Sequence, residues 1–367
     1  MLFGIWLMKK GKADVRRVDP FSPDPQVIAW AAKILRSGGL VAFPTETVYG
    51  LGASALDPRA VARVFLVKGR PVDNPLIVHV AAKEAVFRLA SRVDGRVLRL
   101  MDHFWPGPLT IVLPKKEDLP KEVTAGLDTV AVRMPAHQVA LALIAAAGVP
   151  VAAPSANLSG RPSPTTAEHV LTDLGGAIDA VLDGGPAGIG VESTVLDLTE
   201  PIPVVLRPGG VTPEEICAVI GEVRLGPGAE GEAPARAADE DNLKNPRSPG
   251  MKYRHYAPRA PLILVEGDSR RVAAKVKELA EAKKAGGLRV GILAPAESAS
   301  FYEPENVVTA GSRRCPQQIA ARLYSALRHF DDLGVDVIIA EGIEPVGLGL
   351  AIMNRLRRAA GDRIIRV

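Results

Sequence analysis

The stretch LVAFPTET (40–47) decides the fold of the first half of the chain. Its apolar part, LVAFP, has the length and the content of Val and Phe that are typical of a buried strand. Polar residues follow this strand at once, with Thr45 and Thr47 on either side of Glu46. Polar groups after the strands of an α/β sheet gather in one crevice. The stretch therefore predicts a strand that ends at a binding site.

The same arrangement recurs over the first 220 residues. Further strands are predicted at 75–80, 109–114, 129–135, 150–155, 193–199 and 203–209, and helices at 24–37, 60–67, 82–90, 138–147 and 166–174. The strands 193–199 and 203–209 are too close together for a helix between them, so they predict a hairpin and a mixed sheet. We therefore expect residues 1–220 to form one mixed α/β domain.

The character of the chain changes after residue 220. Residues 221–260 are rich in Gly, Pro, Ala and charged residues and hold few large apolar side chains, which is typical of a linker. Strands and helices then alternate, with strands at 261–266, 289–294, 306–309 and 335–341 and helices at 269–285, 316–333 and 348–360. This alternation predicts a smaller, parallel α/β domain over residues 261–367.

The overall composition is that of a globular protein. Of the 367 residues, 47% are hydrophobic and 23% are charged, and the net charge of +4 permits an anionic ligand or RNA without requiring either. The two cysteines lie far apart, which argues against a disulfide framework and a zinc site. The apolar run at the N-terminus is far shorter than the roughly 20 residues of a membrane helix and lacks the pattern of a signal peptide. We therefore expect a cytoplasmic protein with no membrane partner.

Four cations fall in the predicted crevice, namely Lys68, Arg70, Arg133 and Arg207. This set suits a triphosphate, because guanidinium groups match pairs of phosphate oxygens and lysine acts as a point charge. The chain contains no G-x-x-x-x-G-K-[ST], no G-x-S-x-G and no H-E-x-x-H motif. We expect chemistry without a covalent catalyst, based on positioning and charge stabilisation, which is what attack at phosphorus mainly requires.

Eight motifs follow one another along the chain: FPTETVYGLG (43–52), KGRPVDNPLIVHV (68–80), WPGPLTIVL (105–113), TVAVRMP (129–135), PVAAPSANLSGRPSPT (150–165), GVESTVLDL (190–198), LRPGG (206–210) and SPGMKYRHYAP (248–258). In this order they resemble the YrdC-like threonylcarbamoyl-adenylate synthases, whose characteristic signature pairs Lys68-x-Arg70 with Ser155-x-Asn157. The tail GLGLAIMNRLRRAA (347–360) resembles the end of the long, two-domain form of that family.

The resemblance implies a fold and a reaction. The fold is a strongly twisted mixed sheet with a positively charged concave face, a linker that folds onto it, and a Rossmann-like C-terminal domain. The reaction is a nucleotidyl transfer, in which L-threonine, bicarbonate or CO₂, and ATP give threonylcarbamoyl-AMP and pyrophosphate. A threonylcarbamoyl-transfer complex then passes the group to an adenosine of tRNA. Mg²⁺ is expected to accompany ATP, held by phosphates and water and not by protein side chains.

The resemblance also implies a role for individual residues. The catalytic positions are Lys68, Arg70, Ser155 and Asn157. The positions for threonine are Thr47, His79, Arg133, Ala153 and Ser193, with Arg133 as the partner of its carboxylate. The positions around ATP are Arg70, Asn74, Thr129, Ser155, Ser163 and Arg207, together with a tyrosine of the linker that is either Tyr253 or Tyr256.

Several alternatives stay open at this point. His79 could take part in proton transfer or could be a hydrogen-bonded structural residue. Segment 248–258 could close over the nucleotide as a lid or could only tether the second domain. Direct binding of tRNA, the oligomeric state and the role of the C-terminal domain are open as well.

Two other functions compete with the adenylating enzyme. The first is a non-catalytic protein that binds double-stranded RNA or tRNA on the same basic surface. Such a protein would show salt-sensitive RNA affinity, whereas the enzyme would release pyrophosphate only with threonine and bicarbonate present. The second is carbamoyl-adenylate chemistry on another substrate, as in hydrogenase-maturation relatives. The acylphosphatase and zinc-finger segments of those relatives are absent from this sequence, which argues against it.

Overall fold

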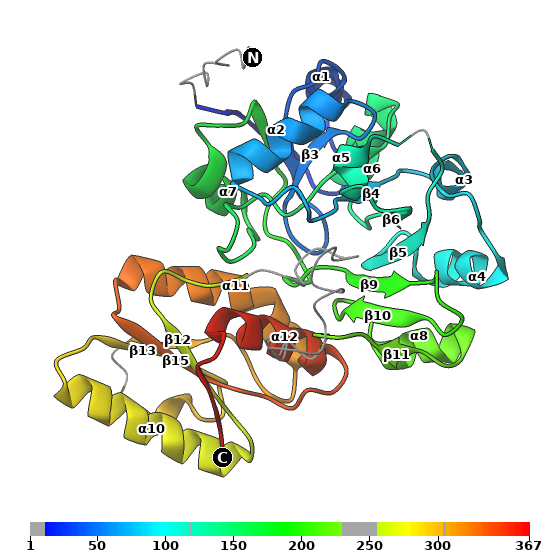
Figure 1. Cartoon of the computed structure of the whole chain (residues 1–367). Helices are drawn as coiled ribbons and strands as arrows, with labels where there is room; N and C mark the ends of the chain where they lie inside the picture. Colours follow the sequence, from blue (N-terminus) through cyan, green and yellow to red (C-terminus); the bar gives the residue numbers. More distant parts are fainter. Residues whose placement is uncertain (1–11, 118, 230–254, 304–305) are drawn as a thin grey trace, which may run out of the picture.

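The structure, a computed structural model, describes residues 12–117, 119–229, 255–303 and 306–367. It contains two α/β domains, each with its own sheet, so the expected fold class is confirmed (Figure 1). Tyr253 and most of the predicted linker lie outside the described residues. The domain boundaries at 220 and 260 stay predictions.

The first domain is built on a mixed sheet. Among the described residues this sheet has eleven strands: β1 (Asp14–Arg17), β2 (Val41–Phe43), β3 (Gly50–Ser54), β4 (Ile77–His79), β5 (Leu109–Pro114), β6 (Thr129–Arg133), β7 (Val151–Ala152), β8 (Ala180–Asp183), β9 (Thr194–Asp197), β10 (Val204–Arg207) and β11 (Arg224–Leu225). Their order is β1-β8-β2-β3-β7-β4-β6-β5-β9-β10-β11. The predicted hairpin is confirmed, because β9 and β10 pair antiparallel. Parallel pairs such as β4 with β6 make the sheet mixed.

Helices pack against this sheet on both sides of the central strands (Figure 1). They are α1 (Pro25–Arg36), α2 (Pro58–Lys68), α3 (Val86–Leu89), α4 (Gly95–Phe104), α5 (Lys121–Thr124), α6 (Gln138–Ala147), α7 (Ala167–Leu174) and α8 (Pro213–Ile220), with a 3₁₀ turn at Lys83–Ala85. The start of α2 follows from its sequence, because the Asp57 side chain accepts from the backbone N–H groups of Arg59 and Ala60 and Pro58 opens the helix.

The end of α2 places two predicted site residues. Lys68 is the last helical residue, and Gly69 follows with a φ of +58°, in the left-handed region that favours glycine. This turn ends the helix and sends the chain on to Arg70. Lys68 is therefore held under the crevice by the helix, while Arg70 stands at its rim on the following turn.

The second domain has a parallel sheet. Its strands are β12 (Leu262–Glu266), β13 (Val290–Ala294), β14 (Val307–Thr309), β15 (Val337–Glu341) and β16 (Ile364–Arg366), in the order β14-β13-β15-β12-β16, and every pair is parallel. Its helices are α10 (Ser269–Ala285), α11 (Pro316–Leu333) and α12 (Leu348–Ala360), with a 3₁₀ turn at Ala299–Phe301. The predicted alternation of strands and helices is confirmed, and only β16 was not predicted.

The two domains share an apolar core. Val48 and Val191 of the first domain belong to the same buried cluster as Leu323 and Tyr324 of α11 and Ile352 of α12. Helices α11 and α12 face the first domain, whereas α10 covers the opposite face of the second sheet (Figure 1). Within the described ranges we find no helix with the length and apolar character that crossing a bilayer requires.

Candidate active site

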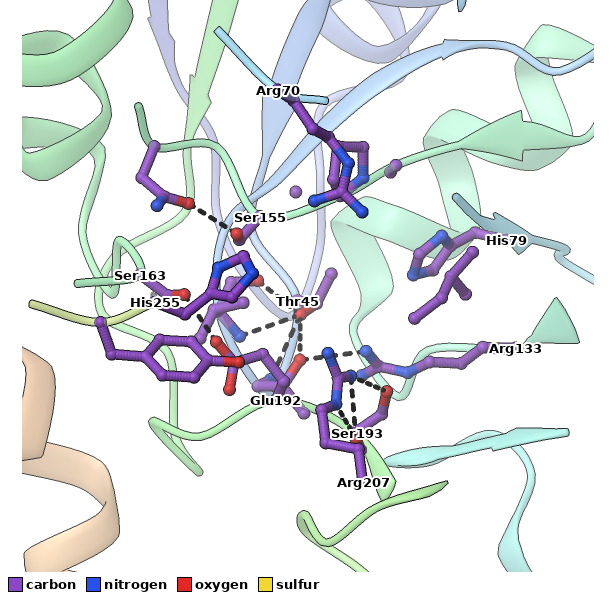
Figure 2. Close-up of a pocket in the computed structure, with 18 of the residues that line it drawn as sticks. Thr45, Arg70, His79, Arg133, Ser155, Ser163, Glu192, Ser193, Arg207 and His255 are labelled. Carbon is purple, nitrogen blue, oxygen red and sulfur yellow. Dashed lines mark hydrogen bonds between the residues drawn. The ribbon is translucent and has the colours of Figure 1, made fainter. Parts of the chain in front are cut away.

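One cavity collects most of the predicted site residues (Figure 2). Its empty space measures about 660 Å³, open solvent included. Of the predicted residues, its lining includes Thr47, Arg70, His79, Arg133, Ala153, Ser155, Asn157, Ser163, Ser193, Arg207 and Tyr256. It also includes residues to which the sequence assigned no role: Thr45, Val48, Gly50, Ile77, Pro154, Arg161, Glu192 and His255. Side chains from both halves of the mixed sheet and from residues 255–256 thus converge on one space.

Arg70 and Arg207 give the cavity its positive charge. Arg70 donates to the backbone oxygens of Asn74 and Pro75 at 3.2 and 3.1 Å, and Arg207 donates to the backbone oxygen and Oγ of Ser193 at 2.9 and 3.2 Å. Burial lowers the pKa of Arg70 to about 10, and the charge of Arg207 acts in the same direction. Burial also lowers the pKa of Arg207. Because these hydrogen bonds go to neutral oxygens, a bound anion would stabilise both cations.

The turn Ser155–Asn157 is held from below by Lys68. The Lys68 Nζ donates to the backbone oxygens of Ser155 and Asn157, both at 2.5 Å, and Lys68 is only 3% exposed. Burial, with Arg70 acting in the same direction, keeps the pKa of Lys68 well below its usual value. Lys68 does not line the cavity, contrary to the expectation that four cations face it. Its place in the structure is under the turn, so its predicted catalytic role stays a prediction.

Arg133 lies on the other side of the cavity with Glu46. Its Nη2 is 2.7 Å from Oε1 of Glu46, its Nη1 donates to Thr47 Oγ1 at 3.1 Å, and its Nε donates to the Gly107 oxygen at 3.2 Å. The ion pair lacks hydrogen-bond geometry, which leaves both buried oxygens of Glu46 without a hydrogen-bond partner. This carboxylate, beside the arginine that is predicted to bind the carboxylate of threonine, has no predicted role.

His79 and His255 are both neutral in this environment. Burial lowers the pKa of His79 to about 3, with Arg133 acting in the same direction. Burial lowers the pKa of His255 to about 3 as well, with Arg70 as the next cause. Neither imidazole can therefore act as a cationic acid near pH 7. Nδ1 of His79 and Nε2 of His255 are buried without a hydrogen-bond partner within the described part of the chain, so both remain free to meet a ligand.

Three predicted ATP positions are not part of the cavity lining. Asn74 is 1% exposed, and neither atom of its side-chain amide has a hydrogen-bond partner among the described residues. Thr129 opens β6 four residues before Arg133, on the same face of the strand and roughly 13 Å along it. Only a ligand that extends this far would meet both residues. Tyr253 lies outside the described residues, whereas Tyr256 lines the cavity.

Glu192 is the residue that sequence analysis missed most clearly. Its carboxylate accepts hydrogen bonds from Ser163 Oγ at 2.6 Å and from Arg355 Nε at 2.8 Å. Figure 2 shows Ser163 beside His255 and, below them, the carboxylate of Glu192 joined to Ser163 by a dashed line. The motif GVEST (190–194) had placed Glu192 directly before the predicted Ser193, which was the one available signal. Nothing local indicates a partner 163 residues away in the second domain.

Comparison with known proteins identifies the family. A curated relative from Pyrococcus abyssi, called threonylcarbamoyl-AMP synthase, is 53% identical over 92% of this chain and 95% of its own length. A relative of the same name from Bacillus subtilis is 51% identical over 98% of this chain and its full length. This chain belongs to the threonylcarbamoyl-AMP synthase family.

Family models agree with this assignment along the chain. Residues 33–209 match the Sua5/YciO/YrdC model, described as telomere recombination, and residues 211–361 match the C-terminal domain of threonylcarbamoyl-AMP synthases. A crystal structure of P. abyssi Sua5 in complex with L-threonine superposes with a TM-score of 0.89 and 52% identity, covering 96% of this chain and 99% of that one. The resemblance found from the sequence motifs is thereby confirmed.

The threonylcarbamoyl-AMP synthases also include shorter proteins. A relative of that name from Halorhodospira halophila is 39% identical over 45% of this chain and 86% of its own length. A protein of this size is too short to hold both domains. This chain therefore has a second domain that the shorter relative lacks.

No protein cage for a metal exists in the described residues. No group of three or more His, Cys, Asp or Glu side chains there is placed to hold an ion. The two carboxylates nearest the site, Glu46 and Glu192, are each paired with an arginine. This donor set fits a Mg²⁺ ion whose ligands are mostly phosphate oxygens and water.

Proposed function

We propose that this chain makes threonylcarbamoyl-AMP and pyrophosphate from L-threonine, bicarbonate and ATP. The observation that carries the proposal is that one cavity joins two differently charged parts. Arg70 and Arg207 bring positive charge that is bonded to neutral oxygens. Arg133, Thr47 and Ser193 bring hydrogen-bonding groups that line the same cavity and suit a small amino acid. An ATP molecule and a threonine would lie next to each other in such a cavity.

The proposed reaction has two steps. The amine of threonine attacks the carbon of CO₂ or of bicarbonate, which loses water, and a carbamate forms. A carbamate oxygen then attacks the α-phosphorus of ATP, and the bond to the β-phosphate breaks to release pyrophosphate. Arg70 and Arg207 would offset the negative charge that grows on the phosphates, which is the main task in phosphoryl and nucleotidyl transfer. Lys68 would act through the backbone of the Ser155–Asn157 turn that it holds.

The wider setting is also part of the proposal. Mg²⁺ would arrive with ATP and neutralise the phosphates, without a protein carboxylate as a dedicated ligand. The product would pass to a threonylcarbamoyl-transfer complex for modification of tRNA in the cytoplasm. His79, neutral and with one free ring nitrogen, would hydrogen-bond a substrate and not supply a proton.

The direct test is pyrophosphate release from ATP across a series of amino acids. We expect release that requires both bicarbonate and threonine. Serine should be a poorer substrate, although a pocket for one methyl group discriminates by only about 1–3 kcal/mol. Arg70→Ala should mainly impair the use of ATP, and Arg133→Ala should mainly raise the threonine concentration needed. Reversed effects would mean that the two parts of the cavity are exchanged.

The competing function is non-catalytic RNA binding. It would appear as salt-sensitive affinity for tRNA or for duplex RNA, without release of pyrophosphate. Full-length similarity to proteins named threonylcarbamoyl-AMP synthase favours the enzyme. Release of pyrophosphate that does not require threonine and bicarbonate would contradict our proposal.

A further inference from the structure

Glu192 joins the cavity to the second domain. From the first domain, Ser163 donates to its carboxylate at 2.6 Å. From the second domain, Tyr324 on α11 donates at 2.9 Å and Arg355 on α12 donates at 2.8 Å. Glu192 is 6% exposed and Arg355 is 0% exposed. A buried carboxylate at the edge of the cavity is therefore shared between a predicted ATP contact and two residues from the other domain.

Glu192 and Arg355 depend on each other for their charge. Burial alone would raise the pKa of Glu192, but Arg355, followed by Arg207, lowers it to about 2. Burial alone would lower the pKa of Arg355, but Glu192 raises it above its usual value. A buried charge without its partner is strongly unfavourable, so the buried carboxylate of Glu192 is kept ionised mainly by Arg355 of the second domain.

The ionised carboxylate decides how Ser163 is oriented. A carboxylate only accepts hydrogen bonds, so the hydroxyl hydrogen of Ser163 must point at Glu192. The lone pairs of Ser163 Oγ are then what it can offer to a ligand in the cavity. Phosphate oxygens at neutral pH are acceptors themselves, so they cannot be its partner. The partner must be a donor, which on ATP means a sugar hydroxyl or the amino group of adenine.

The same second-domain residues support Tyr256, the other predicted ATP contact on this side. The ring of Tyr256 stacks on the ring of Tyr324 with centroids 5.4 Å apart and planes at 27°. The guanidinium of Arg355 lies 5.3 Å from the centre of the Tyr256 ring. Tyr324 and Arg355 therefore contact both Glu192 and Tyr256, which line the cavity.

The loop that carries Glu192 lies directly on α11. Gly190 has a φ of +81°, and a Cβ at this position would come within 2.3 Å of the Ala320 oxygen and 2.4 Å of the Ala321 Cα. Only glycine permits this approach of two backbones. Next to it, the hydroxyl groups of Thr165 and Ser325 lie 2.9 Å apart. The distance between Glu192 and Tyr324 is thus set by the packing of the domains.

We propose that Tyr324 and Arg355 are positioning residues for the reaction in the first domain: through Glu192 they fix Ser163 as a hydrogen-bond acceptor for the sugar or the base of ATP. The proposal rests on the proposed function. It assigns the second domain of the long form a share in nucleotide recognition, which the shorter members of the family must achieve without it.

The first experiment uses Tyr324→Phe, with Ser325→Ala as its control. Tyr324→Phe keeps the ring stack and removes the hydrogen bonds to Glu192, whereas Ser325→Ala removes a bond across the same domain boundary that does not touch Glu192. We expect the KM for ATP to rise roughly tenfold in Tyr324→Phe, with kcat and the KM for threonine changed much less. Ser325→Ala should match the wild type. Equal effects in both variants would overturn the proposal, because they would show that each change only weakens the contact between the two domains.

The second experiment asks whether Ser163 acts as an acceptor. Turnover is compared between ATP and three analogues that each lack one donor: 2′-deoxy-ATP, 3′-deoxy-ATP and ITP, which has no amino group. We expect the wild type to discriminate against at least one analogue, and this discrimination to fall in Ser163→Ala and Tyr324→Phe but not in Ser325→Ala. Equal turnover of all four nucleotides, or unchanged discrimination in both site variants, would contradict the role of Ser163.

The third experiment tests the charge coupling. Arg355→Met should lose most activity, because Glu192 keeps its position but loses its counter-charge. The double variant Glu192→Gln with Arg355→Met removes both charges and should recover stability, but not the low KM for ATP. A double variant with a wild-type KM would overturn the proposal. Failure of the wild type itself to release pyrophosphate with threonine and bicarbonate would instead count against the proposed function.

Discussion

Each of the two domains has a crevice at the ends of its strands, and the two crevices differ in how their charges are paired. In the first domain, Arg70 and Arg207 donate to neutral oxygens. In the second domain, Glu341 at the end of β15 accepts from Ser298 Oγ at 2.6 Å and from Tyr302 OH at 2.5 Å, and it also pairs with Arg313. The first crevice has positive charge available for a ligand, whereas the second neutralises its own charge.

The position in the fold does not explain this difference. The chain leaves β13 towards β14 on one side and leaves β15 towards β16 on the other, so the crevice between β13 and β15 is a switch point of the kind that often binds ligands. The cavity found there is about 290 Å³, open solvent included, and apart from Glu341 its wall is apolar. The two crevices therefore share a position at the ends of strands and differ in the pairing of their charges. The second domain instead reaches the active site through α11 and α12.

The largest effect should come from removing one arginine from each crevice and comparing turnover. Arg207→Met should lower kcat/KM by about 100-fold or more, because a cation aimed at the reacting phosphates is lost. The matched change in the other crevice, Arg313→Met, should leave kcat/KM within about twofold, a change of under 0.5 kcal/mol. Pyrophosphate release measures both. Similar losses in the two variants would mean that the second crevice takes part in the reaction.

Stability should respond in the opposite sense. Arg313→Met leaves the fully buried carboxylate of Glu341 without its cation, which should lower the free energy of unfolding by about 3 kcal/mol. Arg207→Met removes a buried cation whose hydrogen bonds go to neutral oxygens and whose effect on Glu192 is second to that of Arg355, so its loss of stability should be smaller. Amide hydrogen exchange in β15 and in β10 reports the two domains separately. The pair Glu341→Gln with Arg313→Met should restore part of the loss, and no recovery would argue that Arg313 acts by packing alone.

The smallest effect concerns pH. His79 is neutral in the folded protein, with its pKa lowered to about 3, while the unfolded chain takes up a proton near 6.5. Its neutral form therefore contributes stability that is complete above pH 6.5 and is lost as the pH falls towards 3. When the pH falls from 7 to 5, the free energy of unfolding should decrease by about 1–2 kcal/mol less in His79→Gln than in the wild type. Thermal or urea unfolding measures this difference. An identical loss in both would mean that His79 is not buried as a neutral group.

Much of the fold could be predicted from local pattern. Runs such as LTIVLP became β5, and QVALALIAAA became α6. The strand β3 was missed because its sequence, GLGAS, has no β-branched or aromatic side chain; it is a strand because β2 and β7 pair with it on both sides. The edge strands β1 and β11 were missed because DVRR and RL are polar and exposed. Pairing across the sheet decided these segments, and local sequence does not contain that information.

The site residues that stand near the ends of strands could be predicted from the sequence. The pairs whose members lie far apart along the chain could not. Arg70 and Ser155 lie shortly after the ends of α2 and β7, Arg207 is the last residue of β10, and all three line the cavity. Lys68 was expected to face the ligand, but the last turn of α2 carries it under Ser155. Glu46 and Glu192 were not assigned roles because their arginine partners lie 87 and 163 positions further along the chain. Such ion pairs depend on tertiary packing.

The ion pair between Glu192 and Arg355 has a consequence for synthesis of the protein on the ribosome. Arg355 is added 163 residues after Glu192, which at the usual pace of translation means a delay on the order of 10 to 30 s. During this interval the first domain can form its sheet, but Glu192 has neither Arg355 nor Tyr324 to contact. A newly made first domain would keep Glu192 in contact with water, and Ser163 would take its final orientation only when the last helix has left the ribosome.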